Sequence, residues 1–143
     1  MEKTFTITMK KTGPMQFTTT FDKDFPTLIF DEPPSSGGED NYANASRVLT
    51  AAVANCLSAS FTFCAAKAKI PVKDLETEAT CTTDRGEEGF WRIQKIDVKI
   101  NPVFEPGSAE KRKTRCLEIF KNYCVVTGSV TKGIDVNVDV NLD

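Results

Sequence analysis

The stretch that decides the fold, Asn44 to Lys69, has the sequence N-A-S-R-V-L-T-A-A-V-A-N-C-L-S-A-S-F-T-F-C-A-A-K-A-K. It contains no charged residue between Arg47 and Lys67. Apolar and small residues recur in it every three or four positions, which is the pattern of an amphipathic helix with one face toward a core. The members of this face are Leu49, Ala52, Val53, Cys56, Leu57, Ser60, Phe61 and Cys64.

A second stripe of small or mildly polar residues also carries no charge, so the helix is predicted to be covered on most of its sides. The uncharged run approaches the ~20 residues that cross a bilayer. However, Asn, Ser and Thr side chains interrupt it, which favours a buried central helix over a membrane span. Ser46 is a suitable N-cap for its first turn. The second stripe consists of Ala51, Asn55, Ser58 and Thr62.

Length and composition indicate a single domain that spans residues 1–143. The formal net charge is −2 at pH 7, so no bulk attraction to nucleic acid or to an anionic membrane is expected. The segment Met1–Lys10 contains no apolar leader, and the cytoplasm is therefore the predicted compartment.

The chain has 5 cysteines and no histidine. The absence of histidine excludes Ser-His-Asp and Cys-His catalysis and zinc sites with histidine ligands. No two cysteines form a C-x-x-C pair, and an odd number without a leader argues against a secreted disulfide framework. Any catalysis by side chains therefore depends on thiols, carboxylates, hydroxyls, Lys or Arg. The cysteines are Cys56, Cys64, Cys81, Cys116 and Cys124.

Alternating apolar and polar residues predict strands on both sides of the central helix. A change of apolar parity between Ile93 and Ile96 indicates a β-bulge. Ser108 is a candidate cap for a second helix, whose apolar face contains Cys116, Phe120 and Cys124. The predicted strands are Thr4–Lys10, Met15–Phe21, Thr27–Phe30, Asp74–Thr83, Phe90–Val103 and Ile134–Leu142.

The resulting order, β-β-β-α-β-β-α-β, predicts an α+β fold with a largely antiparallel sheet and a buried central helix. A helix with so little charge is unusual on the surface of a small monomer. A second copy of the chain would cover its remaining face, so a homodimer is predicted.

A reactive cysteine needs a nearby cation or a helix N-terminus to stabilise its thiolate. Cys56 lies about ten residues into its own helix, and the nearest cation in the sequence is Arg47. Nine residues of helix separate the two by ~13.5 Å and place them on opposite faces. Arg47 can therefore act on Cys56 only across a dimer interface or through a broken helix. By spacing alone, a buried structural thiol is the favoured role of Cys56.

The order of several motifs resembles the OsmC/Ohr family, the osmotically inducible protein C and organic hydroperoxide resistance proteins. The resemblance covers nearly the whole chain. It rests on D-x-P-x-x-x-G-G (Asp31 to Gly38), L-x-A-A-x-A-x-C (Leu49–Cys56), the exit Ala66–Val72, Y-C-V-V-T (Tyr123–Thr127) and G-I-x-V-x-V (Gly133–Val138).

This resemblance implies an intertwined homodimer with an OsmC-like fold and peroxide-reducing sites at the subunit interface. Cys56 matches the cysteine that attacks the peroxide, and Cys124 matches the one that then forms a disulfide with it. An external dithiol, such as a lipoyl group, would reduce this disulfide, with no metal or flavin cofactor. Cys64, Cys81 and Cys116 match no catalytic position, so they are expected in the core.

The chain departs from the family at the activating Arg–Glu pair. No arginine precedes Arg47, and Ser46 and Arg47 stand where the family's peroxidases carry the glutamate. Arg47 is the remaining candidate cation, with Glu39 or Asp40 as its partner. A thiol-dependent hydroperoxide reductase is the favoured function. The alternatives are a non-catalytic redox switch and a small-molecule binding protein with the acidic loop 31–40 as its lid.

Overall fold

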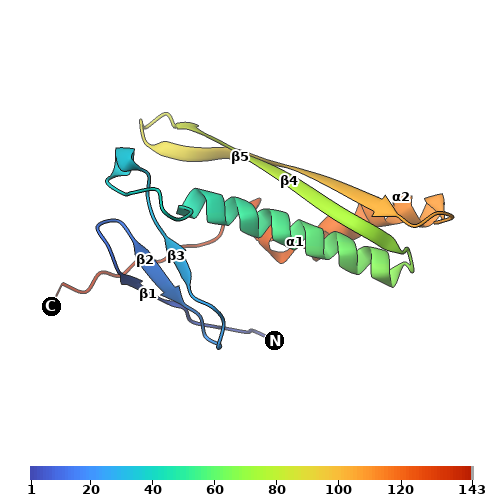
Figure 1. The fold of residues 1–143 in the computed structure, drawn as a ribbon, viewed down its shortest axis with the longest axis horizontal. Helices are drawn as coiled ribbons and strands as arrows, with labels where there is room; N and C mark the ends of the chain where they lie inside the picture. Colours follow the sequence, from blue (N-terminus) through green and yellow to red (C-terminus); the bar gives the residue numbers. More distant parts are fainter. Residues whose placement is uncertain (143) are drawn as a thin grey trace. The chain divides into compact units, whose positions relative to one another are not determined.

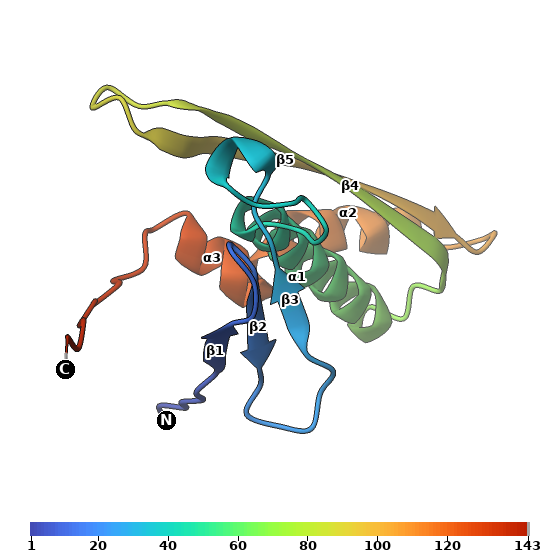
Figure 2. The ribbon, with the colours of Figure 1, turned by 60° about the vertical axis from the view of Figure 1, so that its left-hand side comes forward.

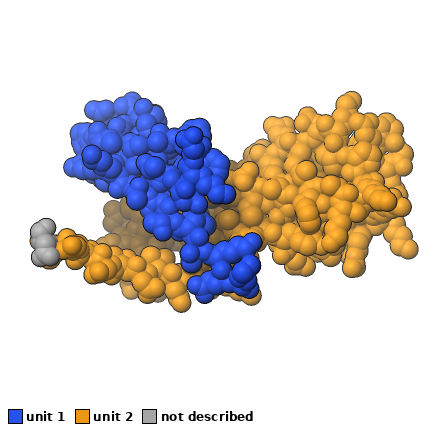
Figure 3. Space-filling view, turned by 90° about the horizontal axis from the view of Figure 1, so that it is seen from below, with its two compact units in different colours: residues 1–49 blue, residues 50–143 orange. Residues whose placement is uncertain are grey.

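The computed structural model describes residues 1–142 and divides the chain into two compact units, which Figure 3 colours separately. The first unit comprises residues 1–49, and the second begins at Thr50. In chain order the elements are β1 (Thr8–Lys11), β2 (Phe17–Thr20), β3 (Leu28–Phe30), the 3-10 turn η1 (Pro34–Ser36), α1 (Ala45–Lys67), β4 (Val72–Arg85), β5 (Trp91–Phe104), α2 (Glu110–Ile119), the 3-10 turn η2 (Phe120–Tyr123) and α3 (Val125–Val130) (Figure 1).

The first unit is built on a three-stranded antiparallel sheet in the order β1-β2-β3. Thr8 pairs with Thr20 and Phe17 with Phe30, so each strand folds back on the one before it. The turn between β1 and β2 is closed by the Thr12 amide, which donates to the Gln16 carbonyl at 2.9 Å. The three strands predicted for this region are confirmed; each is shorter than predicted, and β1 ends one residue later, at Lys11.

The loop after β3 is held by the carboxylate of Asp31, which is only 3% exposed. Its oxygens accept the amides of Glu32 at 2.8 Å and Asn41 at 3.1 Å. The Asn41 hydrogen bond is the main cause that lowers the pKa of Asp31. A Cβ on Gly38 would lie 1.8 Å from the Glu32 carbonyl oxygen, so only glycine fits there. The first and last residues of the D-x-P-x-x-x-G-G motif are thus explained by backbone geometry.

Helix α1 begins one residue before the predicted cap. The Oδ1 of Asn44 accepts the backbone amide of Arg47 at 3.2 Å, which is the usual bond from an N-cap to the third helical residue. The prediction of Ser46 as the cap is therefore wrong. Asn and Ser cap helices about equally well, so the sequence alone does not distinguish two candidates this close together.

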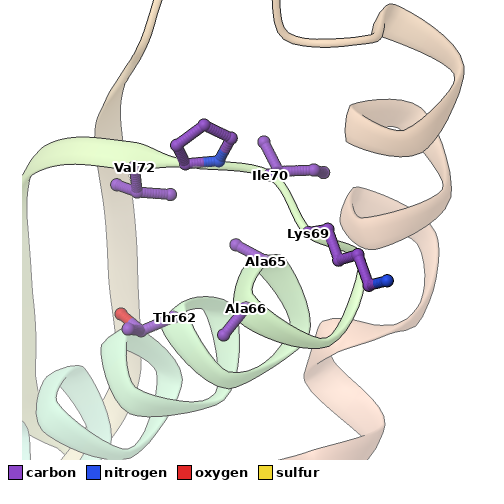
Figure 4. Close-up of a pocket in the computed structure, with 7 residues that line it drawn as sticks. Thr62, Ala65, Ala66, Lys69, Ile70 and Val72 are labelled. Carbon is purple, nitrogen blue, oxygen red and sulfur yellow. The ribbon is translucent and has the colours of Figure 1, made fainter.

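The C-terminus of α1 is a Schellman motif. The amide of Ile70 donates to the carbonyl of Ala65 at 2.9 Å, and the amide of Lys69 donates to that of Ala66 at 3.1 Å. Lys69 occupies the left-handed position with φ 55, where glycine is the favoured residue (Figure 4). Pro71 follows and prevents any continuation of the helix.

The second unit pairs α1 with a long antiparallel hairpin of β4 and β5. Both ribbon views show the hairpin alongside the helix (Figures 1 and 2). The hydroxyls of Ser58 on α1 and Thr77 on β4 are 2.6 Å apart, so part of the small polar stripe faces the hairpin. Thr82 pairs with Lys95 and Thr83 with Ile93, which confirms the predicted bulge.

The core of the second unit lies between α1 and the segment that follows β5. By length and composition α1 is apolar enough to cross a membrane, but core helices of soluble proteins meet the same criterion. Phe61 is 2% exposed and stacks edge-on against Phe120 at 5.5 Å. The buried members of the core are Val53, Leu57, Phe61, Cys64, Ala65, Ile70, Cys116, Phe120 and Cys124.

The helix predicted after Ser108 is divided into α2 and the 3-10 turn η2, and α3 follows as a separate short helix. Ala109 is the N-cap of α2 without a side-chain bond, and the Ser108 hydroxyl instead donates to the Glu105 carbonyl at 2.7 Å. Cys124 takes extended backbone angles, φ −82 and ψ 99, and this break starts α3. The break matters for the site because it turns the amides of α3 toward the thiols.

The prediction of a last strand at Ile134–Leu142 is wrong for the single chain. Residues 134–142 form neither helix nor strand. A strand requires a hydrogen-bonding neighbour, which alternation of side chains cannot supply. The apolar side chains of this segment are each more than 60% exposed: Ile134, Val136, Val138, Val140 and Leu142.

Candidate functional site

The structure brings Cys56 and Cys124 together although 68 positions separate them in the sequence. Cys56 lies in the middle of α1, and Cys124 is the N-cap of α3. Their thiols are in hydrogen-bonding contact, and both are reduced. Cys124 is 2% exposed, whereas Cys56 is half-buried.

The sulfur of Cys124 makes two hydrogen bonds to Thr127. The backbone amide of Thr127 donates to Sγ at 3.3 Å, and the Cys124 thiol donates to the Thr127 hydroxyl oxygen at 3.0 Å. When Cys124 ionises, the same hydroxyl can donate to the thiolate. Burial by itself raises the pKa of Cys124, but hydrogen bonds from Cys56, Thr127 and Ser60 together outweigh burial and lower that pKa. When the pair loses its first proton, the negative charge is therefore favoured on Cys124.

The opposite direction applies to Cys56. Burial and the hydrogen bond to Cys124 raise its pKa, and the amides of Val125 and Val126 only partly counteract them. Cys56 thus keeps the shared proton and donates it toward Cys124. The helix N-terminus that acts on Cys56 belongs to α3, a different helix from its own, and this is why spacing within α1 did not indicate it.

A pocket of about 360 Å³ gives access to Cys56. Its aromatic walls are Phe63 and Tyr123, whose rings meet edge-on at 5.3 Å. The ammonium of Lys67 lies 5.9 Å from the centroid of the Tyr123 ring. Small apolar molecules can therefore approach Cys56, whereas Cys124 is covered. The pocket lining consists of Cys56, Ala59, Ser60, Phe63 and Tyr123.

Arg47, the predicted activating cation, lies in the first turn of α1 and belongs to the first unit. Its side chain is exposed, and its Nη1 donates to Asn44 Oδ1 at 3.3 Å. The groups that shift the pKa values of Cys56 and Cys124 all belong to the second unit. A role for Arg47 therefore stays a prediction.

Sequence reasoning missed two residues that touch the thiol pair, Thr127 and Ser60. Thr127 follows Cys124 by three positions, the spacing at which an N-cap side chain meets its helix, so the C-V-V-T sequence contained this signal. Ser60 lies one turn after Cys56 on the same stripe. Its single hydroxyl proton also reaches the Cys56 carbonyl at 2.8 Å, so its support of Cys124 is weaker than that of Thr127.

A larger hollow of about 480 Å³ lies at the end of α1 (Figure 4). Alanine, isoleucine, proline and valine side chains make most of its wall, and the cysteines are not among its lining residues. It therefore offers space without a thiol. The smaller pocket at Cys56 is the candidate site because this opening meets a polarised thiol pair.

The model of the OsmC-like protein family matches residues 38–139, which is most of the chain. The chain belongs to the OsmC-like protein family. This confirms the resemblance drawn from the motifs. The matched segment contains α1, the hairpin and both thiols of the candidate site. No curated protein sequence matches the chain significantly.

Solved structures confirm the OsmC-like α+β fold with antiparallel sheets. An OsmC-like protein of unknown function from Vibrio cholerae superimposes with a TM-score of 0.76 at 13% identity, over 89% of this chain and 93% of that one. An OsmC-like protein from Mycoplasma pneumoniae superimposes with a TM-score of 0.73 at 16% identity, over 99% of this chain and 98% of that one. An organic hydroperoxide resistance protein from Elizabethkingia anophelis superimposes with a TM-score of 0.70 at 20% identity, over 93% of this chain and 91% of that one.

Proposed function

We propose that this OsmC-like protein reduces organic hydroperoxides with Cys56 as the attacking thiol and Cys124 as the resolving thiol. The observation that supports it is the contact of the two thiols at the N-terminus of α3, with Cys56 open to a pocket. In the overall reaction one hydroperoxide becomes an alcohol and water. The two thiols lose two electrons and two protons and become a disulfide.

The division of charge suggests how the reaction starts. A hydroperoxide in the pocket meets Cys56, which is still protonated, and Cys124 accepts that proton as a base. The Cys56 thiolate then attacks one peroxide oxygen, breaks the O–O bond and becomes a sulfenic acid while the alkoxide leaves and is protonated. Cys124 attacks the sulfenic sulfur, the disulfide forms and water leaves.

The pocket walls favour an organic substrate over hydrogen peroxide. Phe63 and Tyr123 offer apolar surface to an alkyl or aryl group, and burying it contributes binding free energy that hydrogen peroxide cannot gain. The name of the Elizabethkingia anophelis relative, an organic hydroperoxide resistance protein, points in the same direction. Oxidative-stress defence is the corresponding role.

An external dithiol would complete the cycle by thiol–disulfide exchange, without metal or flavin chemistry in the steps above. A lipoyl group is the dithiol we propose. The reducing cytoplasm is the proposed compartment, because it keeps free thiols reduced between turnovers.

The protein is further proposed to act as an intertwined homodimer. The five apolar side chains of residues 134–142 alternate as they do in a strand and remain exposed. A second copy can supply the hydrogen-bonding neighbour that this segment needs. Sedimentation velocity tests this assembly, with a dimer as the expected species. A monomer that is fully active contradicts it.

Stopped-flow kinetics of the reduced protein tests the proposed activity. We expect faster consumption of cumene hydroperoxide than of hydrogen peroxide, followed by a Cys56–Cys124 disulfide in peptide mass spectrometry. A rate no faster than that of free cysteine, with a disulfide that still forms slowly, would instead favour a redox switch. This second candidate function is supported by the raised pKa of Cys56, which slows attack.

Arg47→Ala tests whether a cation outside the described surroundings of the thiols activates them. If Arg47 acts in the dimer, its loss raises the pKa of the attacking thiol. The reaction then slows severalfold at neutral pH, and the pH–rate profile moves to higher pH. Arg112→Ala, which removes another exposed arginine, is the matched control. An unchanged profile in Arg47→Ala excludes the activating role.

A further inference from the structure

A second pair of thiols lies in the same core, apart from the candidate site. Cys64 on α1 and Cys116 on α2 are 4% and 2% exposed. Their thiols are in side-chain contact. The Sγ of Cys64 lies 3.9 Å from the Cys116 carbonyl oxygen, and the Sγ of Cys116 lies 4.0 Å from the Phe61 carbonyl oxygen. The two side chains are thus directed at each other's helix.

The packing of the two segments explains why two pairs exist. Cys56 and Cys64 are eight residues apart on α1, and Cys116 and Cys124 are eight residues apart on the returning segment. The first cysteine of one segment faces the last of the other, as expected when two segments run in opposite directions. The antiparallel register that brings Cys56 to Cys124 therefore also brings Cys64 to Cys116.

The surroundings of the second pair differ from those of the first. The neighbouring rings of Phe61 and Phe120 are apolar, and the polar atoms that reach the sulfurs are carbonyl oxygens, which cannot stabilise a thiolate. Burial, together with the contact to Cys64, raises the pKa of Cys116 to about 12. A thiol of this kind reacts slowly, and burial further restricts access by any reagent.

We propose that Cys64 and Cys116 are a second disulfide-forming site, which oxidises slowly and links α1 covalently to α2. Two S–H bonds break and one S–S bond forms. The two electrons and two protons pass to a hydroperoxide, which becomes an alcohol and water, or to a diazene oxidant such as diamide, which becomes the hydrazine. The site does not depend on the proposed function, since a diazene can oxidise it without reaction at Cys56.

Two consequences follow from a second disulfide. The chain can deliver four electrons instead of two, so without a reductant one chain consumes two equivalents of oxidant. The new link also closes a loop of about fifty residues between α1 and α2. Such a loop raises the thermal midpoint by roughly 10 °C in a chain of this length.

The test uses the double variant Cys56→Ser/Cys124→Ser, which leaves Cys64, Cys81 and Cys116 as the remaining cysteines. The native, reduced variant is incubated with diamide, quenched, unfolded and alkylated with N-ethylmaleimide. We expect one peptide pair linked through Cys64 and Cys116, alkylation at Cys81 and a raised thermal midpoint. The matched control adds Cys64→Ser, and it should show neither the link nor the shift.

Alkylation of both Cys64 and Cys116 after prolonged exposure to diamide overturns the proposal. So does a link from either of them to Cys81. The same oxidation and peptide map on the wild-type protein keeps the test decisive if the variant does not fold. There the expected products are the separate Cys64–Cys116 and Cys56–Cys124 links, and exchanged pairings contradict the proposal. Hydroperoxide kinetics at Cys56 tests the proposed function independently.

Discussion

Each of the two thiol pairs joins a cysteine of α1 to a cysteine of the segment that follows β5, yet the electrostatic surroundings of the two pairs are opposite. At Cys56 and Cys124, the amides and the hydroxyl at the start of α3 point toward sulfur. At Cys64 and Cys116, carbonyl oxygens and aromatic rings surround the sulfurs. The pKa of Cys124 is lowered, whereas that of Cys116 is raised to about 12.

The difference shows that thiol reactivity in this fold depends on the chain break at Cys124. If α2 continued without interruption, no free amides would lie near either thiol of the site. The break at η2 and the restart at α3 expose the first-turn amides at this one position. The second pair joins Cys64 on α1 to Cys116 on α2, eight residues before the break at Cys124, so both of its thiols lie inside continuous helices.

The largest expected effect comes from removing the attacking thiol. Cys56→Ser should reduce hydroperoxide consumption to the uncatalysed background, because a serine hydroxyl is not ionised at neutral pH. The measurement is the stopped-flow rate with cumene hydroperoxide. Cys64→Ser is the matched control on the same helix and should retain the initial rate. Retention of full activity in Cys56→Ser would sink the assignment of the two pairs.

The second prediction uses the raised pKa of Cys116. The unfolded chain ionises this thiol near pH 8.5, whereas the folded chain keeps it protonated until about pH 12. The unfolded state is therefore favoured as pH rises through this window. Between about pH 8 and about pH 10.5, the free energy of unfolding should fall by about 2.5 kcal/mol from this thiol alone.

Denaturant unfolding under reducing conditions measures this fall. In Cys116→Ala the fall should be smaller by that amount, although the variant is less stable at every pH because of the lost packing. Cys81→Ala should show the same fall in the free energy of unfolding with pH as the wild type. An equal pH dependence in Cys116→Ala and the wild type contradicts the prediction.

The third prediction concerns Thr127, whose hydroxyl distinguishes the reactive pair from the buried one. Thr127→Val keeps the shape and the backbone amide but removes the hydroxyl 3.0 Å from Cys124. The first apparent pKa of the pair should rise by about one unit, which corresponds to ~1.4 kcal/mol. The ultraviolet absorbance of the thiolate measures it. Thr131→Val, one turn further along, should leave the titration unchanged, and an unchanged titration in Thr127→Val would remove the hydroxyl from the explanation.

The smallest effect separates stability from thiol chemistry. Lys69 has φ 55, a conformation that costs a side-chain-bearing residue about 1 kcal/mol. Lys69→Gly should raise the free energy of unfolding by up to about 1 kcal/mol with no change in the titration of either pair. Lys67→Gly, inside the helix, should lower stability by a similar amount. A loss of stability in Lys69→Gly contradicts the assigned role of this turn.

Local periodicity predicted much of this fold. The uncharged stretch became α1 within two residues at each end, and the change of parity near Ile93 became a bulge in β5. The motif order indicated the family. Predictions of caps were less successful, because Asn44 and Ser46 are both suitable and only the helix geometry distinguishes them. The strand at residues 134–142 has the right alternation but lacks a neighbour in the described chain.

By itself, the sequence determined the elements, the family and the absence of histidine chemistry, because helix and strand periods are properties of neighbouring residues. Only the tertiary structure decided which thiols meet and which of them carries the charge. Those outcomes depend on the register between α1 and a segment some fifty residues or more away, and on the amides that one break in that segment exposes. Long-range packing fixes both, and no local pattern encodes it.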